Sequence, residues 1–172
     1  MNWSEGSLGR VFVIRLEEGE EFNPSLETFA AERGVKRGVV FLLGGAGTGS
    51  RVVVGPATSD QGEGTNSELI TADATPGSSY TSETQTPIHP LVHALAAPHE
   101  VLAIGTLFPD PQGRPVLHMH AAAGREGRAT VGCTRAGTIT WLVAEAILLE
   151  ILGTTGERRV DPATGFELLN AR

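Results

Sequence analysis

Short apolar segments separated by turn signals most constrain the fold of this chain. Residues 100–108, 115–123 and 128–134 have strand length and apolar or alternating character, and residues 109–114 and 124–127 between them are rich in Pro and Gly. Consecutive strands joined by tight turns form antiparallel hairpins. The sequence therefore predicts an antiparallel meander here, in which alternate side chains point to opposite faces.

The same patterns predict further elements toward the N-terminus. Alternating or apolar segments predict strands over 10–16, 38–43 and 51–55. A helix is predicted over 24–33, because Asn23 is suited to the N-cap position, Pro24 to the first turn and Gly34 to the C-terminal end.

Other segments leave alternatives open. Residues 138–152 fit a strand in their first half and a helix in their second, and 87–97 fit either a short helix or a strand. Residues 56–66 and 73–87 are rich in Gly, Ser, Thr, Asp and Pro and predict loops, with a strand over 67–72 between them.

Length and composition predict one domain with a turn-rich fold and much β-structure. The chain has 172 residues, and we expect a tail over 1–8 and the domain over 9–172. A single cysteine and an N-terminus without a signal-peptide pattern indicate a cytoplasmic protein. The longest apolar stretch, 139–152, is too short and too polar to span a membrane.

The charge balance argues against an extensive nucleic-acid interface. The formal net charge is −7, and the sequence contains no Lys/Arg block longer than two residues. Nucleic-acid affinity depends strongly on cations that neutralise phosphates. Tight, direct DNA binding is therefore disfavoured.

Two of the five histidines, His118 and His120, stand two residues apart in the predicted strand 115–123. Residues at this spacing share one face of a sheet. If the turn at 124–127 closes a symmetric hairpin, His118 lies opposite Cys133, the only cysteine. The three side chains would then share one face, within reach of one metal ion. The preceding hairpin is expected to place small residues opposite the histidines, Gly105 opposite His118 and Ala103 opposite His120.

Two imidazoles and a thiolate suit zinc, with a fourth position left for another ligand. The candidates for this position are His99, His93, Glu145 and a small molecule. The competing interpretation is that the histidines form an ordinary polar face and that Cys133 is a small core residue.

Three other motifs have simpler explanations. The glycine-rich segment 44–50 lacks the Lys of a phosphate-binding loop and fits a bend between strands. The Gly-Arg-Pro at 113–115 fits a hairpin turn better than an AT-hook, because flanking basic residues are missing. Arg158, Arg159 and Asp161 are expected in a salt-bridged turn with a surface or interface role.

Several stretches in order resemble the plants-and-prokaryotes conserved (PPC) domain, a family often described as DNA-binding. They are the opening strand with Arg10 and Gly19-Glu20, the helix ending at Gly34-Val35, the Gly44-Gly45-Ala46 bend, Gly105-Thr106 before the histidine strand 115–121, Ala144-Glu145, and the closing segment 159–166. The resemblance implies a single compact α/β (α+β) domain, mainly antiparallel β-sheet with flanking helices. It also implies a homotrimer and, in some members, a metal at the His-x-His strand with a third His on the next strand. This chain has Cys133 where that third His is expected.

Two functions follow from this resemblance. The first is a homotrimeric PPC-domain protein, DNA-associated or regulatory, with a zinc site at His118, His120 and Cys133. The family's DNA link comes largely from members with attached AT-hooks, which this chain lacks. The second, by similarity of fold to zinc-dependent acetolactate decarboxylase, is a small zinc enzyme acting on a carbonyl or carboxylate substrate, with Glu145 or His99 as general acid/base. An enzyme is the less favoured of the two.

Overall fold

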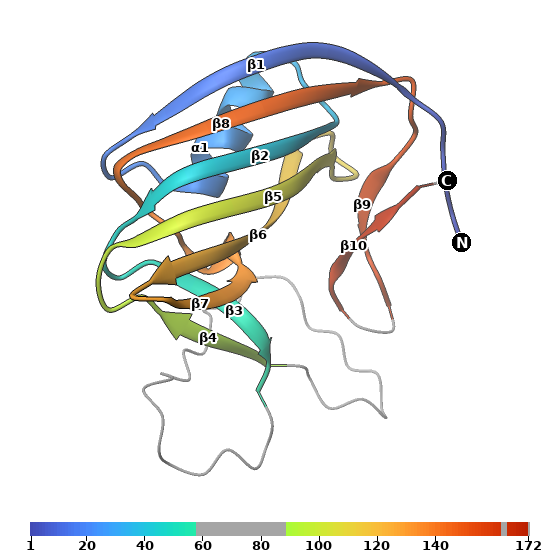
Figure 1. Cartoon of the computed structure of the whole chain (residues 1–172). Coiled ribbons are helices and arrows are strands. Elements are labelled where there is room, and N and C mark those ends of the chain that lie inside the picture. Colours follow the sequence, from blue (N-terminus) through green and yellow to red (C-terminus); the bar gives the residue numbers. More distant parts are fainter. Residues whose placement is uncertain (58–88, 163–164, 172) are drawn as a thin grey trace.

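Eight strands form one antiparallel sheet in the order β1-β8-β2-β5-β6-β7-β3-β4 (Figure 1). The computed structural model describes residues 1–57, 89–162 and 165–171. The sheet strands are β1 (Ser7–Glu17), β2 (Gly38–Ala46), β3 (Arg51–Pro56), β4 (Pro90–Ala94), β5 (His99–Pro109), β6 (Pro115–Arg125), β7 (Arg128–Cys133) and β8 (Thr140–Leu152). The other elements are helix α1 (Phe22–Glu32), the 3₁₀ turn η1 (Thr134–Ala136) and the hairpin of β9 (Glu157–Val160) and β10 (Glu167–Asn170).

Helix α1 covers one face of the sheet, and the core lies between them. Its apolar residues Phe22, Leu26 and Ala30 are fully buried. Strand β6 alternates as the sequence predicts, and its residues Leu117, Met119, Ala121 and Ala123 belong to this core. The even-numbered residues of β6, which include both histidines, therefore point to the other face.

That other face exposes apolar side chains across several strands. One cross-strand row consists of Val13, Ile147, Phe41 and Ile104 and continues into His120 and Cys133. Val13 is 81% exposed and Ile104 55% exposed. Contiguous apolar surface of this kind is typical of interaction sites. The metal-ligand candidates thus stand at the edge of an uncovered apolar face.

The structure resolves the segments that the sequence left open. Residues 138–152 contribute one long strand, β8, and 87–97 contribute strand β4. Residues 58–88 lie outside the described residues. They include the strand predicted over 67–72 and most of the loops predicted over 56–66 and 73–87. No helix in the described parts of the chain is long and apolar enough to cross a membrane.

The predicted N-cap of α1 was wrong. The cap position belongs to Glu21, and Asn23 lies inside the first turn. The buried Asn23 amide instead donates to the Leu117 carbonyl (2.8 Å) and accepts from the Thr134 hydroxyl (2.6 Å). Glu27 accepts from the Leu117 N–H (2.7 Å). Side chains of α1 thus satisfy the backbone of β6 where no β7 residue pairs with it.

Candidate metal centre

The histidines and the cysteine come together through pairing of β6 with β7, although the predicted register was wrong. Cys133 lies opposite His120, and not opposite His118. The reason is the turn: Glu126 and Gly127 both adopt left-handed backbone conformations (φ 52° and 74°), which close a two-residue hairpin. The shift relative to the prediction is two residues, so each side chain keeps its face and the three candidate ligands still converge.

The register predicted for β5 and β6 was wrong by one residue. His118 lies opposite Thr106 and His120 opposite Ile104, while Gly105 faces Met119 on the core side. The cause is the connecting turn, in which the buried Asp110 accepts from the N–H of Gln112 and of Arg114 and sets the pairing that follows. The two histidines therefore do not have the small residues opposite them that the sequence predicted to leave room for an ion.

The geometry of the three side chains fits a metal ion. The two Nε2 atoms of His118 and His120 are 3.0 Å apart, and the rings are inclined by 66°. One ligand atom from each histidine and Sγ of Cys133 all lie within 4.8 Å of one another. Two nitrogen ligands of a tetrahedral zinc ion are about 3.3 Å apart, given zinc–nitrogen distances near 2.0–2.1 Å. Small side-chain rotations would bring the group to zinc geometry.

The electrostatic surroundings keep His118 in the form that binds metal. Burial is the main cause that lowers the pKa of His118 to about 4, and Arg135, Arg158 and His120 lower it further. Its imidazole is therefore neutral at pH 7, and only the neutral ring offers a lone pair to a cation. The positive charges of Arg135 and Arg158 also favour binding of an anionic ligand beside His118.

The candidate ligands line a cavity of about 810 Å³. Strand β3, strand β7 and the β9–β10 connection supply most of its apolar wall, including Val53, Val131 and Phe166. Arg135 and Glu167 are the charged residues among its lining. A mostly apolar cavity with a few convergent polar groups is the usual form of a small-molecule site.

Arg158 is placed differently from the surface role that the sequence predicted. The residue is 2% exposed, and its guanidinium donates to the carbonyl and the hydroxyl of Thr106, the residue opposite His118. Within the described residues its Nε has no hydrogen-bond partner. Arg159, its neighbour, forms an ion pair with Glu157, which the sequence did not predict as its partner. Sequence reasoning missed both Arg135 and Arg158 as neighbours of the site, because their placement depends on long-range packing.

The other candidates named from the sequence are not brought to this site. Glu145 lies on β8, which β2 and β5 separate from β6, roughly 14 Å away at normal strand spacing. His99 points to the core-side face, and its Nδ1 lies 2.7 Å from the Ala97 carbonyl oxygen. His93 lines a pocket together with His99. Among described residues, the metal-ligand group comprises His118, His120 and Cys133.

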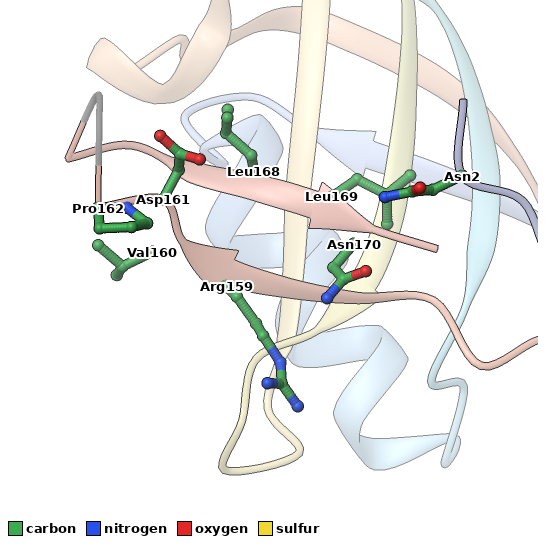
Figure 2. Close-up of a pocket in the computed structure, with 8 residues that line it drawn as sticks. All are labelled: Asn2, Arg159, Val160, Asp161, Pro162, Leu168, Leu169 and Asn170. Atoms are coloured by element: carbon green, nitrogen blue, oxygen red, sulfur yellow. The ribbon is translucent and has the colours of Figure 1, made fainter. Parts of the chain in front are cut away.

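A separate pocket of about 320 Å³ lies along the C-terminal hairpin (Figure 2). Its lining includes Arg159, Asp161 and Leu168, and Leu168 also contributes to the larger cavity. The figure shows these side chains spread along the two strands rather than converging on one point. This pocket has no His or Cys in its lining and offers no comparable ligand set.

Comparison with known proteins identifies a matching family and one curated relative. Residues 3–152 match the family model of the Plants and Prokaryotes Conserved (PCC) domain. A curated relative, the Bifunctional protein GlmU of a Synechococcus strain, is 29% identical over 163 residues, which cover 94% of this chain. The chain spans only about a fifth (20%) of the length of that relative.

Solved structures share the fold at low sequence identity. A plant- and prokaryote-conserved protein of Pyrococcus horikoshii has a TM-score of 0.72 at 22% identity, covering 99% of this chain and 97% of the other. A metal-containing protein of Archaeoglobus fulgidus has a TM-score of 0.69 at 20% identity, covering 99% of both chains. A protein of Bacteroides thetaiotaomicron, for which DNA binding has been suggested, has a TM-score of 0.62 at 14% identity, covering 98% and 99%.

Proposed function

This chain belongs to the Plants and Prokaryotes Conserved domain family, and we propose that it is a zinc-binding regulatory member, with zinc held by His118, His120 and Cys133. The observation that carries the proposal is the convergence of the three ligand atoms within 4.8 Å at the edge of a cavity. Two imidazoles and one thiolate are ligands that zinc prefers. The metal-containing relative of the same fold adds support.

The proposal is tested by metal analysis of protein purified without a histidine tag. We expect close to one zinc per chain in the wild type and little in Cys133→Ser or His120→Ala. His99→Ala is the matched control, because it removes a histidine that points to the other face of the sheet. A wild type that stays metal-free after zinc is supplied, or a Cys133→Ser variant with full zinc content, would contradict the site.

The cavity beside these ligands supports a regulatory role in which a small molecule completes the metal coordination. Three protein ligands leave one position of a tetrahedral ion for water or for a ligand. The cavity volume of about 810 Å³ is within the range of small-molecule sites. Occupation of this cavity would be the signal that the protein senses.

Association of copies into a homotrimer is the second part of the proposal. The apolar row that contains Val13, Phe41 and Ile104 is exposed in the single chain and needs a partner surface. The family resemblance implies that this partner is the chain itself. Sedimentation at micromolar concentration should give three times the mass of one chain, and a monomer would overturn this part.

The proposal also includes a DNA-associated role, which is supported by the family and by the Bacteroides relative. The net charge of −7 predicts that any direct binding is weak and strongly salt-dependent. Retardation of duplex DNA over a salt series tests it. Absence of retardation at low salt would remove direct DNA recognition and leave the metal proposal unaffected.

A second candidate, a zinc-dependent enzyme acting on a carbonyl or carboxylate substrate, is favoured by Arg135. Its guanidinium lines the same cavity as the three ligands and could bind a carboxylate there. Zinc, when bound, supplies a Lewis acid that polarises a carbonyl oxygen. Glu145 and His99 lie elsewhere, so this version would need another general acid/base. The test is turnover of small oxo acids by zinc-loaded protein, with Arg135→Gln expected to lose turnover and keep its zinc.

A further inference from the structure

A second cluster of charged and titratable side chains lies at the turn end of β6 and β7. A pocket of about 520 Å³ there is lined by His93, His99, Arg125, Glu126 and Arg128 among others. None of the three metal-ligand candidates contributes to its lining. The pocket is therefore distinct from the candidate metal centre.

The register of three neighbouring strands aligns this cluster. Arg125 of β6 is directly opposite Arg128 of β7. Glu100 of β5 pairs with Gly124, so His99 stands level with Arg125 on the same face of the sheet. Directly opposed residues have Cβ atoms about 4.5–5.5 Å apart. Two guanidiniums and one imidazole thus form a row across β5, β6 and β7.

Local contacts fix two members of the row. His99 Nδ1 donates to the Ala97 carbonyl (2.7 Å), which leaves Nε2 for another partner. Arg125 donates to the Pro98 carbonyl (2.9 Å) and to the Glu126 carboxylate (3.1 Å). These bonds orient the groups toward the pocket before any ligand arrives.

The charge of the row is incompletely balanced within the described part of the chain. Glu126 pairs with Arg125, and Arg128 has no ion pair with a described residue. Like charges directly opposite each other in a sheet are destabilising. Two arginines flanking a two-residue turn are therefore an unfavourable arrangement that a bound anion would relieve.

We propose that this pocket binds the phosphate group of a small phosphorylated ligand. Guanidinium groups match phosphate oxygens in paired hydrogen bonds. Two guanidiniums offer more N–H donors than the two oxygens of one carboxylate accept, and they suit a group with three terminal oxygens better. The volume of about 520 Å³ leaves room for an organic part beside the phosphate. The net charge of −7 favours one phosphate group over the extended phosphate array of DNA.

The test is titration of ¹⁵N-labelled, chelator-treated protein with inorganic phosphate and with glycerol phosphate in chloride buffer. We expect saturable shifts of the amides of residues 123–130, without shifts at the metal ligands. Arg128→Gln should weaken binding about tenfold or more, since a charge-assisted hydrogen bond is lost. Arg128→Lys should weaken it less, because the charge is kept and the fork is lost.

The matched control is Arg15→Gln, which removes an exposed, ion-paired arginine from strand β1 and should bind phosphate as the wild type does. Absence of saturable shifts, or equal affinity in wild type and Arg128→Gln, would overturn the proposal. A short DNA duplex forms a second arm of the experiment. If the duplex shifts the same amides and the two small phosphates do not, the pocket serves nucleic acid and the proposal fails. Because the protein is metal-free throughout, the result does not depend on the zinc site.

Discussion

The two ends of the β6–β7 ladder present different chemistry on opposite faces of one sheet. At one end His118 and His120 meet a buried cysteine beside an apolar cavity. At the other end Arg125 meets Arg128 and a histidine in an exposed, charged pocket. Alternate residues of a strand point to opposite faces, so one hairpin can hold a site for a metal cation and a site for an anion without mixing them.

The largest expected difference between the two ends is how much a ligand bound at each of them stabilises the folded protein. At a free zinc concentration one hundred times Kd, zinc should stabilise the wild type by about 2.7 kcal/mol. Cys133→Ser should lose most of this gain, while Arg128→Gln should keep it. Thermal unfolding with zinc and with a chelator measures both. An equal zinc-induced shift in Cys133→Ser and wild type would show that stabilisation comes from elsewhere.

A backbone contact at the metal end provides the second prediction. A Cβ added at Gly132 would lie 2.5 Å from the Val53 carbonyl oxygen, so β3 would have to move away from β7. Gly132→Ala should cost about 2 kcal/mol, as overpacking commonly does, and should weaken zinc binding through Cys133. Gly124→Ala is the control, because its nearest atoms are 3.8 Å away. Equal stability of the two variants in urea would contradict the close approach of β3.

The turns explain which parts of the site could be predicted from the sequence. The β6–β7 prediction missed by two residues, and a shift of two leaves every side chain on its face, so the ligand set was found. The β5–β6 prediction missed by one residue, and a shift of one exchanges the faces, so the neighbours of the histidines were wrong. The positive φ of Glu126 and the capping by Asp110 decide these registers.

Long-range packing explains the parts of the fold and of the site that could not be predicted from the sequence. Alternation in β6 and the helical spacing of α1 were visible locally, and both elements formed, although α1 begins two residues before the predicted start. Strand β8 was ambiguous because both of its faces carry apolar residues, and its pairing with β1 and β2 decides the outcome. The burial of Arg158 beside Thr106 joins residues 52 positions apart, which no local pattern indicates.

The third prediction concerns the link between α1 and the metal end of the β6–β7 ladder. Asn23 bonds the Leu117 carbonyl and the hydroxyl of Thr134, which directly follows Cys133. Asn23→Ala removes the donor to the buried Leu117 carbonyl, while the Thr134 hydroxyl keeps the Met119 carbonyl (3.1 Å), and the change should cost about 1–2 kcal/mol. Thr28→Ala, at an exposed position of the same helix, should change stability little. Phosphate binding at Arg125 and Arg128 should be unaffected in both variants, and a loss there would show that the two ends are coupled.

The smallest effect is expected at Glu27, and its sign depends on pH. Burial raises the pKa of Glu27, although the Leu117 N–H and Arg135 oppose this. A carboxyl with a raised folded-state pKa favours folding while it is protonated, and this contribution is lost as pH rises through the folded-state pKa. Glu27→Gln keeps an oxygen for the Leu117 N–H and removes the charge. The variant should therefore be more stable than wild type at pH 7, by less than about 1 kcal/mol.

The difference between Glu27→Gln and wild type should shrink toward zero below the ordinary glutamate pKa of 4.5, where the carboxyl is neutral in both states. Urea unfolding at several pH values measures it, with Glu32→Gln near the end of the same helix as control. A variant less stable than wild type at pH 7 would mean that the Leu117 N–H and Arg135 together stabilise the Glu27 carboxylate by more than burial destabilises it. Arg135 would then be engaged with the Glu27 carboxylate of α1 and would be less available to bind an anion in the cavity. Anion binding would in that case be left to the pocket of Arg125 and Arg128.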